Sequence, residues 1–256
     1  RNIHISAAEP AEKFGGERQQ DASEFAGWLL DQLHTDLNYS RARGPLMKLT
    51  ASQEAVRREQ PAIQSSWMEW QRFCYANGSV IKRTFFGQNS ITITCPHCGY
   101  IQKTWDPWGQ ITIPIQNTPK GEASLQNLLT DIHAKPSTLE GYRCDQCKQV
   151  GPTTLQKISR CPDILILVLG RNEWNGHEHL KKKTVVRFPL DGLSLDPYFI
   201  SLDGRESERL DDSFLAPFTY DCYVIIEHFG DNPKAGHYVA LVKELDARNG
   251  KDKWFM

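Results

Sequence analysis

Two short cysteine pairs are the residues of this sequence whose spacing predicts chemistry most directly. Cys95-Pro-His-Cys98 and Cys144-Asp-Gln-Cys147 are both Cys-x-x-Cys turns, and 45 residues, from 99 to 143, separate them. Each turn offers two thiolates to one tetrahedral ion, so two turns side by side would surround zinc with four sulfurs and leave no open position for catalysis. We therefore predict a structural zinc site with Cys95, Cys98, Cys144 and Cys147 as ligands.

Two other interpretations of these pairs stay open. The cysteines could be ordinary reduced thiols without a metal, or His97, inside the first pair, could replace one cysteine as a ligand. Turn-forming or polar residues follow each pair, Gly99-Tyr100 and Lys148-Gln149. Such residues are expected where a knuckle lies at the tip of a β-hairpin.

The second candidate site is His237, in the motif Gly236-His237-Tyr238. Apolar runs at 223–230 and 239–243 flank the motif and predict two strands joined by a loop. A histidine held on a strand can act as the general base for a cysteine nucleophile, if the thiol lies within hydrogen-bond reach and a third polar group fixes the ring. Gly236 would let a backbone pass close to this histidine. The alternative is a histidine that only packs on its strand.

Composition and charge exclude several classes of function. The chain has 256 residues and 39% hydrophobic content, which suffices for one large or two small domains with a buried core. With 30 basic and 31 acidic side chains the net charge is −1, so we predict no nucleic-acid or membrane partner and favour a protein partner. The longest strongly apolar run, Ile164 to Leu169, is too short to cross a bilayer, and the chain opens on no signal-peptide pattern.

The cysteines also predict a compartment. There are seven, and four of them form the two pairs, which in a chain without a signal peptide indicates metal binding before disulfides. A reducing compartment, cytoplasmic or nuclear, follows. Cys74, Cys161 and Cys222 are isolated, and the last two adjoin apolar strand patterns that predict packing roles.

Helical patterns occupy the first part of the chain. Asp21 can cap a helix over residues 21–38, Glu24 completes a capping-box pattern, and apolar residues recur at helical spacing to give a core face: Ala22, Phe25, Ala26, Leu29, Leu30, Leu33 and Leu37. Residues 41–60 are polar and predict a surface excursion, and residues 41–72 could be an insertion. A second amphipathic helix is expected around Trp67, Trp70 and Phe73.

Strand patterns dominate from Ile81 onward. We predict a short helix at 124–132, capped by Ser124, and strands at 90–94, 110–115, 164–169, 183–188, 220–228 and 237–242. Because helices come first and no βαβ alternation is visible, the pattern predicts an α+β fold.

The order of the motifs carries a resemblance to a known family. Residues 19–25 (Gln-Gln-Asp-Ala-Ser-Glu-Phe), the cysteine pairs, residues 187–193 (Arg-Phe-Pro-Leu-Asp-Gly-Leu), His228-Phe-Gly and Gly236-His237-Tyr238 follow one another as in the ubiquitin-specific proteases. The chain resembles these papain-like cysteine deubiquitinases over nearly its whole length, including residues 85–88 and 105–108.

The resemblance implies a fold and a domain layout. It implies a papain-like α+β fold compared to a right hand, with a helical thumb, a β-rich palm and zinc-tipped β fingers. The whole chain, 1–256, would be one incomplete catalytic domain. Residues 1–73 would belong to the thumb, 74–160 mainly to the fingers, and 161–256 to the palm with its histidine motif.

The resemblance also implies site roles. The expected reaction is thiol-dependent hydrolysis of the bond after the C-terminal glycine of ubiquitin, with His237 as the general base, and ubiquitin or ubiquitinated proteins as partners. Asp21 corresponds to the acidic residue that helps bind the basic ubiquitin tail, although a purely capping role stays open. Gln20 is a weaker candidate near it, and Gly236 and Tyr238 would shape the channel for the terminal diglycine.

The sequence departs from the family at both ends. The family's nucleophile lies in a Gly-rich cysteine box ahead of the glutamine motif, and residues 1–18 contain no cysteine. The third triad residue, an Asn or Asp, would follow an aromatic pair resembling Trp254-Phe255, just past Met256. We therefore expect a chain cut at both ends and inactive alone. The alternatives are a non-catalytic ubiquitin-binding or scaffold protein of this fold and a zinc-stabilised module unrelated to ubiquitin.

Overall fold

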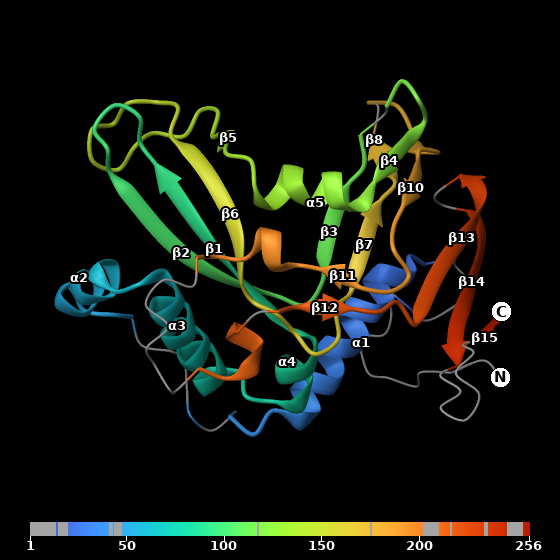
Figure 1. Cartoon of the computed structure of the whole chain (residues 1–256), viewed down its shortest axis with the longest axis horizontal. Helices are drawn as coiled ribbons and strands as arrows, with labels where there is room; N and C mark the ends of the chain where they lie inside the picture. The colour runs from blue at the N-terminus through green and yellow to red at the C-terminus, as the bar shows by residue number, and fades with distance from the viewer. Residues whose placement is uncertain are drawn as a thin grey trace.

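The computed structural model describes residues 14, 20–40, 43, 48–116, 118–174, 176–201, 210–215, 217–232, 235–244 and 253–256. Within these residues the longer helices come first and most strands follow, as several small sheets with the short helix α5 (Leu125–His133) among them (Figure 1). The predicted α+β class is confirmed. Among the described helices, none combines the length and the apolar character needed to cross a bilayer.

The first helix, α1 (Ala22–Leu37), begins where the sequence predicts it. Asp21 caps it by accepting hydrogen bonds from the N–H groups of Ser23, at 2.8 Å, and Glu24, at 3.1 Å. The predicted core face is wrong, because α1 has no buried residue and its leucine stripe is 38% to 50% exposed: Leu29, Leu33 and Leu37. The physical reason is that α1 packs mainly on one short helix, α4 (Val80–Phe85), which is too small to cover that stripe.

The surface excursion predicted over residues 41–60 includes a mostly exposed helix that the sequence pattern did not indicate. That stretch contains α2 (Ala51–Glu59), which starts with a capping box between Thr50 and Gln53. Two backbone donors that would otherwise lack partners are thereby satisfied, which favours a helix even in a polar segment. The next helix, α3 (Ala62–Ala76), is the predicted second amphipathic helix, and it buries Trp70 in the core.

A long antiparallel sheet follows the helices. Its strands are β1 (Gly87–Thr94), β2 (Ile101–Trp108), β5 (Ser137–Thr138) and β6 (Thr153–Arg160), in the spatial order β2-β1-β6-β5. The first half of β1 is buried and α3 contacts this end of the sheet, whereas the other end projects away from the helices (Figure 1). Both cysteine pairs lie at the projecting end, directly after β1 and shortly before β6.

The core extends from α3, which contacts the long sheet, to α5, which contacts one strand of a central parallel pair. This pair consists of β3 (Ile111–Pro114) and β7 (Leu167–Gly170). The strand predicted at 164–169 corresponds to β7 and begins three residues later than predicted, at Leu167. The N–H of Ile164 donates instead to the Thr84 carbonyl at 2.9 Å, so this residue lies outside the ladder. The largest fully buried apolar side chains of the described residues gather here: Ile63, Ile113, Ile115, Leu129, Ile158, Leu195 and Phe214.

A three-stranded sheet ends the chain and carries the histidine motif. Its strands are β13 (Val224–Asn232), β14 (Ala235–Glu244) and β15 (Lys253–Phe255), with β14 in the middle. The predicted strands at 220–228 and 237–242 correspond to β13 and β14, with shifted bounds.

Short strand pairs and turns connect these parts. β4 (Glu122–Ser124) pairs in parallel with β10 (Val185–Arg187), which is the core of the predicted strand at 183–188. β8 (Asn172–Trp174) and β9 (His179–Lys181) form a hairpin whose second strand contacts β13, and β11 (Leu193–Ser194) pairs with β12 (Thr219–Tyr220). Two short 3-10 helices, η3 (Asp196–Tyr198) and η4 (Asp212–Phe214), complete the described elements.

Candidate functional site

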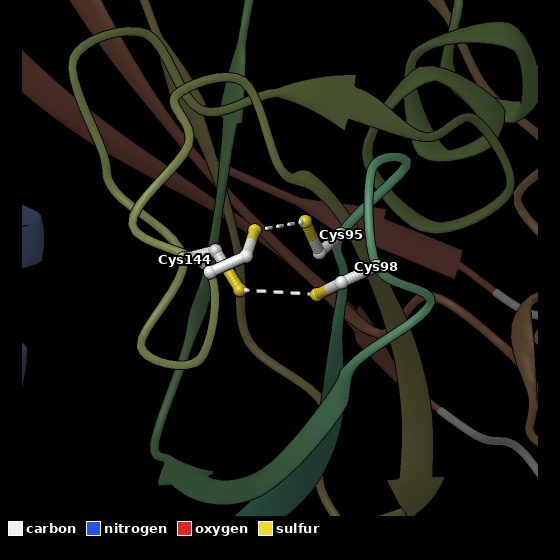
Figure 2. Close-up of side chains that lie close together, drawn as sticks. Cys95, Cys98 and Cys144 are labelled. Carbon is white, nitrogen blue, oxygen red and sulfur yellow. Dashed lines mark hydrogen bonds between the residues drawn. The ribbon is translucent and has the colours of Figure 1, made fainter.

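The four paired cysteines converge on one point. The Sγ atoms of Cys95 and Cys147 are 3.6 Å apart, those of Cys98 and Cys144 are 3.7 Å apart, and all four lie within 4.8 Å of one another (Figure 2). Four thiolates at a Zn–S distance of about 2.3 Å have tetrahedral S···S separations of about 3.8 Å. The predicted ligand set is therefore brought together, with a geometry that suits one tetrahedral ion and thiols that are free of disulfides.

The two turns place their cysteines by the same backbone pattern. In each, the N–H of the first cysteine donates at 2.9 Å to the carbonyl five residues later, and the residue after the second cysteine donates back to the first. That last residue needs a left-handed backbone, with φ of 71° at Gly99 and 62° at Lys148. Because glycine adopts this conformation without a steric cost, the Gly99 turn is locally encoded, whereas Lys148 is held there by the knuckle.

The electrostatics of the cluster favour thiolate formation at one sulfur. Burial raises the pKa of the Cys95 thiol, but hydrogen bonds from the Cys98 and His97 amides and from the Cys147 thiol bring it down to about 6. The His97 ring lies outside the sulfur group, with Nε2 3.3 Å from the Val150 carbonyl oxygen. The structure therefore favours the four-cysteine set over a set that includes this histidine.

His237 lies on β14 with an exposed side chain. It pairs with Phe229 across the hairpin, while the next residue, Tyr238, pairs with His228. Since side chains alternate between the faces of a strand, the histidine and the tyrosine of the motif lie on opposite faces of the sheet. The histidine is thus open to a group that approaches one face, and the tyrosine belongs to the other.

Tyr238 meets Asp21, the residue that caps α1. Burial raises the pKa of this carboxyl, but hydrogen bonds from the Ser23 side chain, from the Glu24 and Ser23 amides and from Tyr238 outweigh it and hold the pKa below its usual value. Asp21 is therefore ionised at neutral pH. Two predicted site residues from distant parts of the sequence are brought together. Gln20, the residue before Asp21, has a half-buried side chain.

Gly236 is required by close packing. A Cβ atom at this position would overlap Nε2 of His228 and the carbonyl oxygen of Phe229. The His228 ring also lies beside the Tyr238 ring, with centroids 4.8 Å apart. The glycine therefore allows β14 to lie directly against a second histidine.

None of the three isolated cysteines offers a thiolate to His237. Burial raises the pKa of Cys74 to about 11 and that of Cys161 to about 12, so both thiols stay protonated at neutral pH. Cys161 is only 2% exposed in the core, which confirms its predicted packing role. Cys222 lies two residues before β13, the strand on which Phe229 pairs with His237. The extended chain between Cys222 and Phe229 spans about 23 Å, so this thiol is far from the His237 ring.

Sequence reasoning missed Lys181 as a site residue. Its Nζ atom contacts His228 and the β13 backbone, as described below. Nothing in the run of three lysines at 181–183 distinguishes the first from the others. His228 belongs to the motif His228-Phe-Gly, and that motif is the available sequence signal.

Comparisons with known proteins agree over nearly the whole chain. The family model described as "Ubiquitin carboxyl-terminal hydrolase" matches residues 2–256. Ubiquitin carboxyl-terminal hydrolase 4 of Vanderwaltozyma polyspora is 32% identical over 241 residues, covering 90% of this chain and 26% of that protein. Probable ubiquitin carboxyl-terminal hydrolase 4 of Schizosaccharomyces pombe is 30% identical over 238 residues, covering 90% of this chain and 38% of that protein.

Solved structures show the same fold. A chain of the SAGA DUB module Ubp8/Sgf11/Sus1/Sgf73 bound to ubiquitin aldehyde matches 96% of this chain with a TM-score of 0.63 and 21% identity. A chain of that module bound to monoubiquitin matches with a TM-score of 0.63 and 22% identity. This chain spans 46% of each of those chains and about a quarter of the first curated relatives.

Proposed function

The chain belongs to the ubiquitin carboxyl-terminal hydrolase family, and we propose that it forms part of a cysteine-type ubiquitinyl hydrolase that cleaves the bond after the C-terminal glycine of ubiquitin. The observation that supports this most directly is the arrangement at β14. An exposed His237 lies next to Tyr238, which contacts the ionised Asp21 at the start of α1. The proposed base, His237, is thus the chain neighbour of Tyr238, which contacts the anionic Asp21 from the other face of the strand.

In the proposed reaction His237 serves as the base and then as the acid. The imidazole takes the proton of a cysteine thiol, and the thiolate attacks the carbonyl carbon of the ubiquitin C-terminal glycine. The imidazolium then gives its proton to the leaving amine, and a thioester remains. The same ring takes a proton from water, which attacks the thioester and releases the ubiquitin carboxylate and the thiol.

The nucleophile in this proposal is a cysteine outside the 256 residues. Four of the seven cysteines form the sulfur cluster. Of the other three, Cys74 and Cys161 have raised pKa values and stay protonated, and Cys222 lies far along the chain from the partner of His237. We accordingly expect these 256 residues alone to lack hydrolytic activity.

Asp21 is the proposed contact for the basic tail of ubiquitin. Its depressed pKa keeps the carboxylate charged, and its position at a helix N-terminus is compatible with capping and binding at once. Gly236 and Tyr238, the residues on either side of the proposed base, would border the channel for the terminal diglycine. Gln20 would contribute less, as the neighbour of Asp21.

The sulfur cluster is proposed to hold one structural zinc ion through Cys95, Cys98, Cys144 and Cys147. When bound, zinc would supply no reaction step, because all four positions of its shell are filled by thiolates. It would join the turn after β1 to the segment before β6 and so stiffen the projecting fingers. The division into thumb, fingers and palm given above is part of the proposal, as is a cytoplasmic or nuclear location, where thiols stay reduced.

A ubiquitin probe with a C-terminal electrophile tests the function on the full-length protein. We expect covalent labelling that His237→Ala slows strongly, because the thiolate then loses its base. Full-rate labelling of His237→Ala would contradict the base assignment. Binding of ubiquitin without any labelling would instead support the alternative, a non-catalytic ubiquitin-binding protein of the same fold.

A further inference from the structure

Lys181, at the end of β9, directs its ammonium group to one segment of β13. Its Nζ atom lies 2.7 Å from the His228 carbonyl oxygen, 2.8 Å from the Gly230 carbonyl oxygen and 3.1 Å from Nδ1 of the His228 ring. An ammonium group has three N–H donors and no acceptor. Its hydrogen-bonding capacity is therefore used up by these contacts with β13.

The contacted segment is irregular. The pairing of β13 with β14 shifts register between Phe229 and Asn232, and Gly230 has a φ of 135°. A bulged strand is not held by its ladder alone, since part of its hydrogen bonding is disrupted. The ammonium binds two carbonyls at this point and ties the segment to the β8–β9 hairpin.

The contact also decides the protonation state of His228. Because Lys181 can only donate, Nδ1 must accept, and the neutral ring then carries its proton on Nε2. Burial lowers the pKa of this histidine, the Lys181 charge lowers it further, and Asp21 opposes both. The Tyr238 ring is the other titratable group packed against it. The ring is thus kept neutral at neutral pH.

The neutral ring lies against the beginning of β14. Its Nε2 edge occupies the space that a Cβ at Gly236 would need, and its face lies beside Tyr238. The next residue in the chain after this glycine is His237. The chain of contacts therefore runs from the Lys181 ammonium through the His228 ring to the two residues that flank the proposed base.

We propose that Lys181 and His228 form a clamp that positions His237 and Tyr238 for hydrolysis by fixing the start of β14. This inference rests on the proposed function. Lys181 acts through His228, so it is a positioning residue. The three consecutive lysines have different partners: Lys181 binds β13, Lys182 donates to the Ile115 carbonyl oxygen at 2.8 Å, and Lys183 forms an exposed ion pair with Asp231 at 2.8 Å.

The test compares two lysine variants in the full-length protein. Lys181→Met keeps the length of the side chain and removes all three donors, and Lys183→Met is the matched control because its side chain is 76% exposed. We expect kcat/KM for a fluorogenic ubiquitin substrate to fall roughly 10- to 100-fold in Lys181→Met and less than about twofold in Lys183→Met. The acid limb of the pH profile should move to higher pH in Lys181→Met, since His228 then protonates more easily.

A substrate-independent readout separates the clamp from the function. Histidine-selective nitrogen NMR of the unmodified protein, assigned with His228→Asn, should show His228 neutral with its proton on Nε2. A proton on Nδ1, or equal kcat/KM in the two lysine variants, would overturn the clamp. An inactive protein with the proton on Nε2 would instead refute the proposed function and leave the Lys181–His228 contact established.

Discussion

The Asp21 carboxylate at the N-terminus of α1 interacts with Tyr238 on β14, and this interaction helps to hold the pKa of the carboxyl below its usual value. These residues come from opposite ends of the described chain, and their contact joins the first helix to the strand that carries His237. The carboxylate thus has a capping partner on its own helix and a partner on the sheet.

The two roles of Asp21 can be separated by mutation. Asparagine caps a helix about as well as aspartate does, so Asp21→Asn should change the free energy of unfolding by less than about 0.5 kcal/mol. It should weaken ubiquitin binding, since the negative charge is lost. Asp21→Ala should lose both the helix cap and the negative charge. The lost cap should lower the free energy of unfolding by about 1 kcal/mol. Urea unfolding and calorimetric titration with ubiquitin measure the two effects, and wild-type affinity in Asp21→Asn would leave capping as its role.

Substitution of Gly236 should disturb the proposed base without touching its ring. In Gly236→Ala the new methyl group overlaps His228 and the Phe229 carbonyl, so β14 must shift. We expect probe labelling of the full-length protein to slow by at least about tenfold, because small displacements of reacting groups are costly. Gly27→Ala is the matched control, since a Cβ at Gly27 meets nothing within 4 Å. It should stabilise α1 by about 0.5–1 kcal/mol and leave the labelling rate unchanged.

Removal of one cluster cysteine should release the metal. Metal analysis should give about one zinc ion per reduced chain, and Cys144→Ser should lose it, because three thiolates no longer fill a tetrahedral shell. Hydrogen exchange should then accelerate in β1, β2 and β6 much more than in α1. The control is Cys74→Ser, which lies in α3 outside the cluster and should retain the ion. A folded, reduced wild-type protein without metal would contradict this prediction.

The buried His133 should make stability depend on acid. Its side chain is fully buried at the end of α5. Burial, and secondarily the charge of Lys157, lower its pKa to about 4, against a weak opposing interaction with the Gln156 backbone. An unfolded histidine titrates near pH 6.5, so the unfolded chain binds more protons between these values and stability falls as pH drops from about 6.5 to about 4.

Acidification should lower the free energy of unfolding by about 3 kcal/mol at most through His133 alone. His133→Gln should flatten the dependence of the unfolding free energy on pH in this window, because glutamine does not titrate. His97→Gln is the control, since that ring is exposed. Urea unfolding at several pH values gives the slopes, and equal slopes in His133→Gln and the wild type would count against a neutral buried ring.

Local signals predicted the elements that depend on few neighbouring residues. The start of α1 follows from Asp21, whose cap reaches only as far as Glu24. The start of β7 was missed, because Ile164 bonds to Thr84, a residue far away in the sequence. Likewise, the spacing of Leu29 and Leu33 predicts an apolar face on α1. Whether that face is buried depends on which distant element packs against the helix.

The sequence by itself determined the chemistry of the site: two thiolate pairs, a histidine behind a glycine, and an acidic helix cap, each encoded within four consecutive residues. Tertiary structure decided how these groups combine. Strand register placed His237 and Tyr238 on opposite faces, chain packing brought Asp21 to Tyr238, and the packing of β9 on β13 brought Lys181 to the bulged segment. The physical reason is that short turns and caps are stabilised by near neighbours, whereas the contacts between distant segments are fixed by the pairing and packing of the whole fold.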